Sequence, residues 1–146
     1  GNSNMIGILL DHVGPGINLR DSNGDTRLHY AARAGQTDIA AGLVMSPSID
    51  PDMMNSNYAT PLLFACSGGY VDIVRLLLAR DDVDALSVCG PDKDETPISA
   101  AIYGGHTVVV DALIKHHLTI GSFENTYETP LSIARKMDHR NVVKLL

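Results

Sequence analysis

The sequence predicts an all-α solenoid in which antiparallel helix pairs stack side by side and are joined by hairpin-like loops. Three observations lead to this prediction. A threonine-led tetrapeptide recurs four times at nearly constant spacing, and the residues after each threonine keep fixed offsets. The composition, with 45% hydrophobic and 19% charged residues over 146 positions, is that of a globular domain of ordinary size.

An internal repeat determines the architecture of a chain of this kind. Its copies begin at threonines that lie 34, 36 and 33 residues apart. The four tetrapeptides are Thr26–His29, Thr60–Leu63, Thr96–Ser99 and Thr129–Ser132. The spacing varies only in the connections between copies, where insertions cost least.

Each threonine is expected to begin a first helix. Threonine is a good N-cap, and the proline that follows it in three copies suits the first helical position, where no N–H is needed. Five residues on, every copy has a small residue that keeps the helix thin: Ala31, Ala65, Ala101 and Ala134. Nine residues on lies a residue suited to a left-handed C-cap in three copies, namely Gly35, Gly69 and Gly105, with Asp138 in the fourth.

A second helix follows in each copy. In the second copy it is expected over Val71–Ala79, where apolar residues recur at helical spacing and Arg75 is the polar interruption. A leucine lies seventeen residues after each threonine: Leu43, Leu77, Leu113 and Leu146. Helices of about ten residues are unstable alone in water, so each pair must be covered by its neighbour.

A period near 33 with Thr-Pro-Leu, then Ala, Gly and a Val-rich second helix, resembles the ankyrin repeat. The copy running from Ala59 through Leu78 is close to the family pattern, and Met5–Asn18 looks like the tail of an earlier copy. The prediction is one ankyrin-repeat domain over 1–146. A partial repeat at 1–20 is followed by repeats at about 21–54, 55–90, 91–123 and 124–146. The cut units at both ends lead us to expect a fragment of a longer protein.

The sequence departs from the family pattern at two positions of the repeat. The family usually has glycine two residues before the threonine, and only Gly24 fits; Tyr58, Asp94 and Tyr127 stand in the other copies. Those hairpins are expected to form a different or looser turn. The histidine after Thr-Pro-Leu survives only as His29, which is expected to be structural in the helix-opening turn, and Ser99 and Ser132 are expected to substitute for it more weakly.

The charge and the cysteine content narrow the classes of binding partner and the cellular compartments that the sequence favours. The net charge is −6, without a basic stripe, which argues against nucleic acid or an anionic membrane surface. No apolar run approaches the length of a membrane helix. Two cysteines do not make a disulfide framework, so a reduced, intracellular protein is expected, cytoplasmic and nuclear locations being equally compatible. Cys66 is expected to pack in a first helix and Cys89 to be exposed in the longest connection; one isolated disulfide stays open.

No catalytic, cofactor or metal site is expected. His106 and His139 follow the glycine position and are interpreted as structural loop residues, while the adjacent His116 and His117 do not share a helix face. Walker, Gly-x-Gly-x-x-Gly and His-Glu-x-x-His motifs are absent from the sequence. The acidic residues between 81 and 95 lack the pattern of a calcium loop, and are read as a solvated loop or as an acidic landing site.

The resemblance implies a protein-binding module whose hairpin tips and first helices line a concave surface. Carried over by position, the candidate contact residues are Arg33, Met54, Asn57, Asp92, Lys93, Glu95, Tyr103, Phe123, Asn125, Glu128, Lys136 and Met137. Acidic residues at the third tip favour a basic segment of the protein partner. The alternative is a regulatory or targeting segment of an enzyme whose catalytic domain lies outside this sequence. The oligomeric state is left open.

Overall fold

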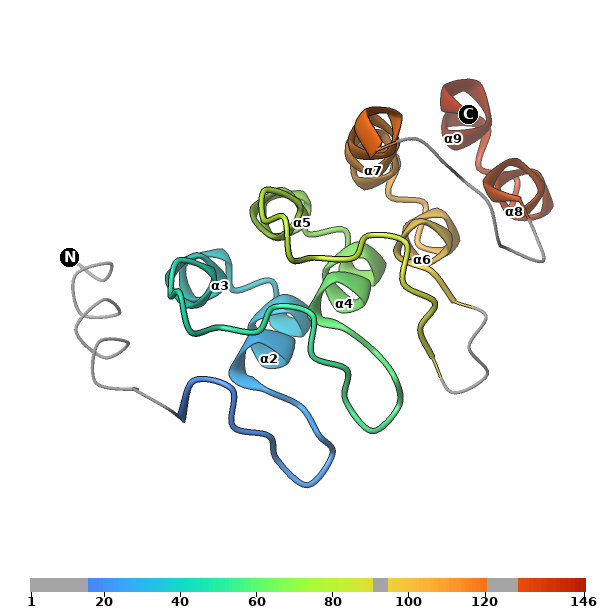
Figure 1. Ribbon diagram of the computed structural model, residues 1–146. Helices are drawn as coiled ribbons and strands as arrows, with labels where there is room; N and C mark the ends of the chain where they lie inside the picture. The colour runs from blue at the N-terminus through green and yellow to red at the C-terminus, as the bar shows by residue number, and fades with distance from the viewer. Residues whose placement is uncertain (1–15, 91–94, 121–128) are drawn as a thin grey trace.

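A computed structural model describes residues 16–90, 95–120 and 129–146 (Figure 1). Within these residues the chain forms four helix pairs. Their bounds are α2 Arg27–Ala34, α3 Thr37–Val44, α4 Pro61–Gly68, α5 Val71–Leu78, α6 Pro97–Tyr103, α7 Thr107–Ile120, α8 Pro130–Lys136 and α9 Arg140–Leu145. The boundaries follow the four threonines, and the all-α class is confirmed.

The helices form two layers. The first helices α2, α4, α6 and α8 contact one another in chain order, and so do the second helices α3, α5, α7 and α9. Figure 1 shows these rows side by side, with the hairpin loops extending from the first-helix row away from the second helices. Each pair therefore touches mainly its neighbours, which is the arrangement of a stacked repeat protein.

The four threonines cap the first helices as expected. Each is extended and its side-chain oxygen accepts a hydrogen bond from the backbone N–H three residues on, as from Leu63 to Thr60 at 3.2 Å. Ser99 completes a capping box, because its hydroxyl accepts from the Thr96 N–H at 2.8 Å. The serine thus substitutes for the histidine of the first copy.

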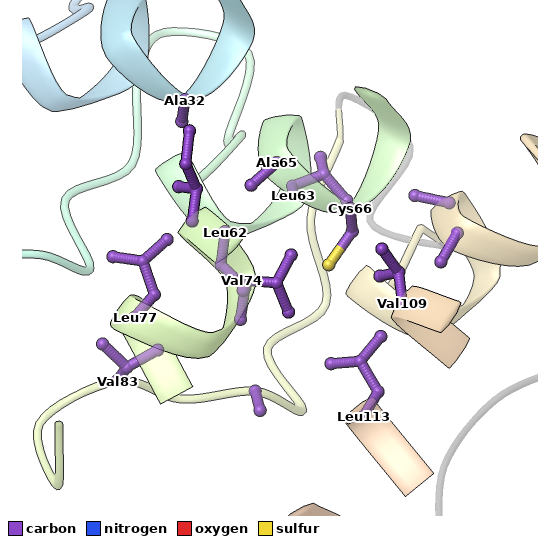
Figure 2. Packing of buried hydrophobic residues seen from close by; sticks show 14 of the residues in the cluster. Ala32, Leu62, Leu63, Ala65, Cys66, Val74, Leu77, Val83, Val109 and Leu113 are labelled. Carbon is purple, nitrogen blue, oxygen red and sulfur yellow. The ribbon is translucent and has the colours of Figure 1, made fainter. Parts of the chain in front are cut away.

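The core lies between the two layers (Figure 2). Leu43, Leu77 and Leu113, at the same register in three second helices, are fully buried. The recurrent alanines of the first helices are also buried. Their small side chains let consecutive first helices pack closely. Leu146 has the same register but is 39% exposed.

At the turn between the two helices of a pair, a ring from the next pair packs over a glycine. Gly35, Gly69 and Gly105 are left-handed, with φ of 67°, 74° and 69°. Gly35 and Gly69 are the C-caps of α2 and α4 as predicted, whereas α6 has its C-cap at Gly104 and Gly105 follows it. A Cβ on Gly35 would overlap the ring of Tyr70 from the next pair, and one on Gly69 would overlap the ring of His106. The glycines therefore serve both the left-handed backbone and the close approach of the next repeat.

The prediction of a different turn at Tyr58 is wrong. Tyr58 has φ of 57°, close to the 75° of Gly24, and its N–H donates to the Asn55 carbonyl just as that of Gly24 donates to Asp21, both at 3.0 Å. The side-chain oxygen of Asn55 accepts from two backbone N–H groups of the hairpin, and Asp21 does the same in the first one. These side chains fix the turn, so tyrosine tolerates the left-handed conformation. Asp94 and Tyr127 lie outside the described residues.

The prediction that Cys89 is exposed is also wrong. Cys89 is fully buried, because the connection after α5 folds back against the start of α4. The Cys89 thiol lies 3.9 Å from the Thr60 hydroxyl, and its backbone forms an isolated antiparallel bridge with Glu95. Cys66 is buried in α4 as expected, and both cysteines are free thiols.

Candidate functional site

One row of side chains on the first helices takes no part in the core. Seven residues after each capping threonine the residue is exposed in all four pairs, whereas the alanine two positions earlier is buried. The row consists of Arg33, Ser67, Tyr103 and Lys136. Together with the exposed residues of the neighbouring hairpins we call it the first-helix face.

The described candidate contact residues mostly lie at the surface. Met54, Tyr103 and Met137 are 36%, 45% and 42% exposed, whereas Glu95 is half-buried. Asn57 and Lys136 are also exposed. The remaining candidates lie outside the described residues: Asp92, Lys93, Phe123, Asn125 and Glu128. Exposure agrees with the assignment, but contact with a partner stays a prediction.

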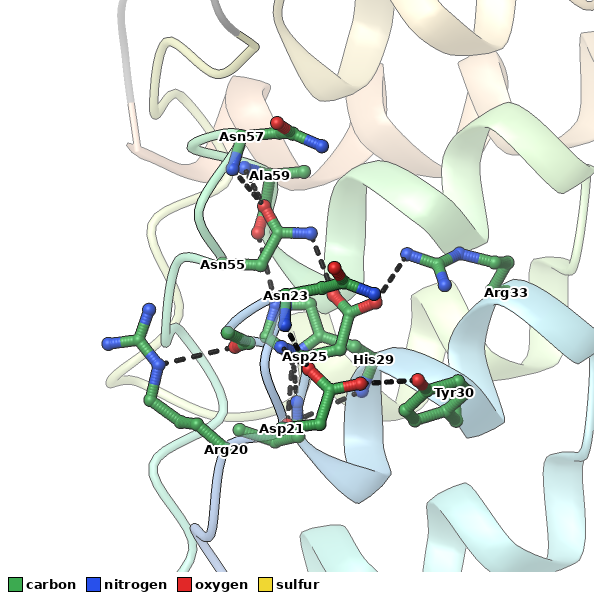
Figure 3. A network of polar contacts seen from close by, with 12 residues as sticks. Arg20, Asp21, Asn23, Asp25, His29, Tyr30, Arg33, Asn55, Asn57 and Ala59 are labelled. Atoms are coloured by element: carbon green, nitrogen blue, oxygen red, sulfur yellow. Dashed lines mark hydrogen bonds and ion pairs between the residues drawn. The ribbon is translucent and has the colours of Figure 1, made fainter.

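Arg33 has a more specific environment than its position alone indicated (Figure 3). Its Nη2 donates to the Asp25 carboxylate at 2.8 Å, and its guanidinium lies 4.1 Å from the ring centroid of Phe64 and 5.7 Å from that of Tyr30. Asp25 is almost fully buried and also accepts from the Asn55 side chain at 2.7 Å. Arg33 therefore joins α2, α4 and two hairpins while remaining 44% exposed.

Two exposed tyrosines on or beside this face were missed by the sequence reasoning. Tyr30 is 47% exposed on α2, and its hydroxyl donates to the Asp21 carboxylate at 2.5 Å. This hydrogen bond raises the pKa of Tyr30 and lowers that of Asp21. Tyr58 is 47% exposed at the second hairpin tip. The aromatic residue four positions after the threonine in two copies, Tyr30 and Phe64, is the signal that could have identified the first of them.

His29 lies beneath the face and links the first two repeats. Its Nδ1 accepts from the Thr26 N–H at 3.0 Å, and its Nε2 donates to the Ala59 carbonyl at 3.0 Å, since an N–H can only donate and a carbonyl only accept. Burial is the main cause that lowers the pKa of His29, and the Ala59 carbonyl opposes it. The structural reading of this histidine is confirmed.

His106 and Cys66 both have structural surroundings. His106 Nε2 lies 2.9 Å from the Ser67 carbonyl, which fits its reading as a structural loop residue. Burial raises the pKa of the Cys66 thiol, which disfavours the nucleophilic thiolate. Within residues 16–90, 95–120 and 129–146 no group of three or more His, Cys, Asp or Glu could hold a metal ion. In the same ranges no helix is long and apolar enough to span a bilayer.

Family models match nearly all of the described chain. A model of a single ankyrin repeat matches residues 23–56 and 57–88, and a model of three ankyrin repeats matches residues 79–146. The two models thus cover the sequence from residue 23 to its end, in register with the helix pairs.

The chain is also similar to parts of larger proteins. It is 28% identical over 133 residues to the transient receptor potential cation channel subfamily A member 1 of Drosophila melanogaster, covering 89% of this chain and 11% of the channel. It is 34% identical over 122 residues to an ankyrin repeat and KH domain-containing protein of Caenorhabditis briggsae, covering 82% and 4%. It is 29% identical over 133 residues to the probable protein S-acyltransferase 23 of Arabidopsis thaliana, covering 86% and 23%. The chain therefore spans less than a quarter of each of these relatives.

Proposed function

Because the chain belongs to the ankyrin-repeat family, we propose that it binds a protein partner through the first-helix face. Ankyrin repeats are protein-interaction modules and are generally non-catalytic. The observation that carries the proposal is the row of exposed residues at one register of all four first helices, beside rows that are buried. Side chains at this register are exposed to a ligand along the whole stack, even where one of them, Arg33, also contacts the next repeat.

The partner's contact segment is proposed to be basic near the third hairpin. Asp92, Asp94 and Glu95 place three carboxylates close together in the sequence there, and Tyr103 lies on the first helix that follows. Opposite charge speeds association, and an exposed aromatic ring is a frequent energetic centre of an interface. The net charge of −6 disfavours nucleic acid and anionic lipid surfaces as alternatives.

An intracellular location is part of the same proposal. Cys66 and Cys89 are both free thiols, and free cysteines persist most readily in reducing compartments.

The test compares two matched triple variants by affinity capture from native lysate with quantitative mass spectrometry. One variant combines Asp92→Lys, Glu95→Lys and Tyr103→Ala, which are candidate contact residues of the third repeat. We expect this variant to lose captured partners by at least about tenfold, because it reverses two charges and removes an interface ring.

The control variant makes comparable changes on the second helices: two charge reversals and one truncation of an exposed apolar side chain. It combines Asp38→Lys and Asp72→Lys, in the first turns of α3 and α5, with Val108→Ala, which is 58% exposed on α7. We expect it to keep its partners, and circular dichroism must show that both variants fold. Equal capture by the wild type and the first-helix variant would overturn the proposal.

A second candidate function is regulation or targeting of a catalytic domain elsewhere in a longer protein. It is favoured by the similarity to segments of a probable S-acyltransferase and of a cation channel, of which this chain spans only a small share. Sequencing the complete transcript tests it directly. A flanking catalytic or channel domain would support this function, and a transcript that encodes only ankyrin repeats would exclude it.

A further inference from the structure

We propose that Arg33, whose guanidinium lies over the Phe64 ring and near the Tyr30 ring, binds an anionic side chain of the partner segment, either a carboxylate or a phosphorylated residue. The proposal rests on the proposed function, since it concerns the same face, and it specifies the chemistry that the α2–α4 end of this face recognises.

The Arg33 guanidinium is fixed before any ligand arrives. It lies over the Phe64 ring at 4.1 Å, and the Asp25 carboxylate holds one of its nitrogens at 2.8 Å. Asp25 is itself anchored by Asn55 from the next repeat. An arginine that is already ordered loses little rotamer entropy on binding, so more of its interaction energy contributes to affinity.

Within the part of the chain that the structure describes, most of the N–H donors of Arg33 have no protein acceptor. A guanidinium carries five N–H groups, and the contacts within the described residues use one of them, toward Asp25. The side chain is 44% exposed on the first-helix face. A planar fork with spare donors matches the two oxygens of a carboxylate or of a phosphate, which arginine binds in a bidentate manner.

The neighbouring carboxylates are occupied by donors of the protein itself. Asp25 accepts from Arg33 and Asn55, and Asp21 accepts from the Tyr30 hydroxyl and from two backbone N–H groups. Arg20, on the same hairpin, donates instead to the backbone carbonyls of Gly24 and Met54. The two carboxylates outweigh the single positive charge of Arg33, so selectivity for an anion comes from directional hydrogen bonds to Arg33 and not from the local field.

No other described position of the exposed row has the same combination. Ser67 and Tyr103 carry no cationic group, and Lys136 is preceded four and three residues earlier by Ser132 and Ile133 instead of an aromatic ring. The anionic group of the partner is thus expected at the α2–α4 end, while its basic group lies near the third hairpin. The order of the two charges fixes the direction of the bound segment.

Selection of phage-displayed random short peptides on the wild-type domain tests this proposal. Enriched peptides are expected to share an acidic residue. One of them is then synthesised with Glu, Gln or phosphoserine at that position. Gln in place of Glu is expected to weaken binding to the wild type about ten- to a hundred-fold, and the Arg33→Gln protein to bind the two equally. The phosphoserine peptide shows which anion the site prefers.

Arg75→Gln is the matched control, because Arg75 is an exposed arginine on the second helix α5. It is expected to keep the full preference for Glu. Should Arg33→Gln unfold the domain, Arg33→Lys takes its place, and the loss of the planar fork is then expected to reduce the preference several-fold. Enriched peptides without an acidic residue, or a preference for Glu that survives the Arg33 variants, would overturn the proposal.

The same peptides separate this proposal from the proposed function. Peptides that depend on Tyr103 but have no acidic preference would refute the role of Arg33 alone. Peptides whose binding depends on neither Tyr103 nor Arg33 would refute the first-helix face as the binding surface. A selection that enriches no peptide counts against both.

Discussion

His29 joins two repeats through one side chain, and its protonation state affects the stability of the domain. Its two ring nitrogens have separate tasks: Nδ1 accepts from the helix-opening turn of its own repeat, and Nε2 reaches the Ala59 carbonyl of the next. Only the neutral ring can do both, because protonated Nδ1 no longer accepts. A proton on His29 therefore costs the Thr26 hydrogen bond as well as the burial of a charge.

Stability is predicted to fall as the pH is lowered, in part through His29. Its pKa in the folded state lies below the ordinary 6.5, so below pH 6.5 the unfolded chain binds more protons than the folded one. The contribution of His29 is complete above that pH and is lost as the pH falls from 6.5 toward the folded pKa. Urea unfolding across this range should show it.

The control for this prediction is His29→Ser, which copies the residue at the same position in the third and fourth repeats. Serine can keep the cap, as Ser99 does, but does not titrate. The variant is expected to be less stable at neutral pH, with a shallower decline toward acid. An unchanged slope would show that other groups carry the pH dependence.

At the scale of the helix pair, the turn between the first and the second helix fixes the position of one repeat relative to the next. Tyr70 occupies the space over Gly35, and His106 occupies the space over Gly69. His106 adds a polar contact to the Ser67 carbonyl. The rings at the starts of α5 and α7 thus each require a residue without a side chain in the turn of the preceding pair.

Gly35→Ala is expected to destabilise the domain by about 1–3 kcal/mol. The left-handed backbone is unfavourable for alanine, and the new methyl group would displace the Tyr70 ring. Gly42→Ala is the matched comparison, since Gly42 lies inside α3. There the same substitution is expected to stabilise by about 0.5–1 kcal/mol through helix propensity. Chemical denaturation measures both, and effects of equal sign would contradict this account.

At the scale of the molecule, stability is a sum over neighbouring pairs. Contacts run from each pair to the next in both layers, and the buried residues form one continuous cluster from Ile17 to Val142. A defect in a central pair therefore weakens two interfaces at once.

Leu77→Ala and Leu146→Ala are predicted to have unequal costs despite their shared register. Leu77 is fully buried in α5, and its truncation is expected to cost about 2–5 kcal/mol through lost burial and a cavity. Leu146 is 39% exposed, and its truncation should cost less than about 1 kcal/mol. Thermal and urea unfolding of this chain provide the comparison, and similar costs would argue against the nearest-neighbour description.

The sequence by itself determined the repeat, the helix caps and the exposed register. Threonine caps, left-handed glycines and helical periodicity act over a few residues, so they can be read without knowing what lies nearby in space. Tyr103 and Met137 were predicted at the surface from their position in the repeat, and they lie there.

Only the tertiary structure decided the features that depend on partners about thirty residues away. Cys89 is buried because its loop returns to Thr60, and Arg33 is fixed because Phe64 and Asn55 belong to the next repeat. A one-dimensional pattern gives the phase of each residue in its own repeat. The pattern does not give the contacts between neighbouring repeats, and these contacts decide which surface residues are held rigidly.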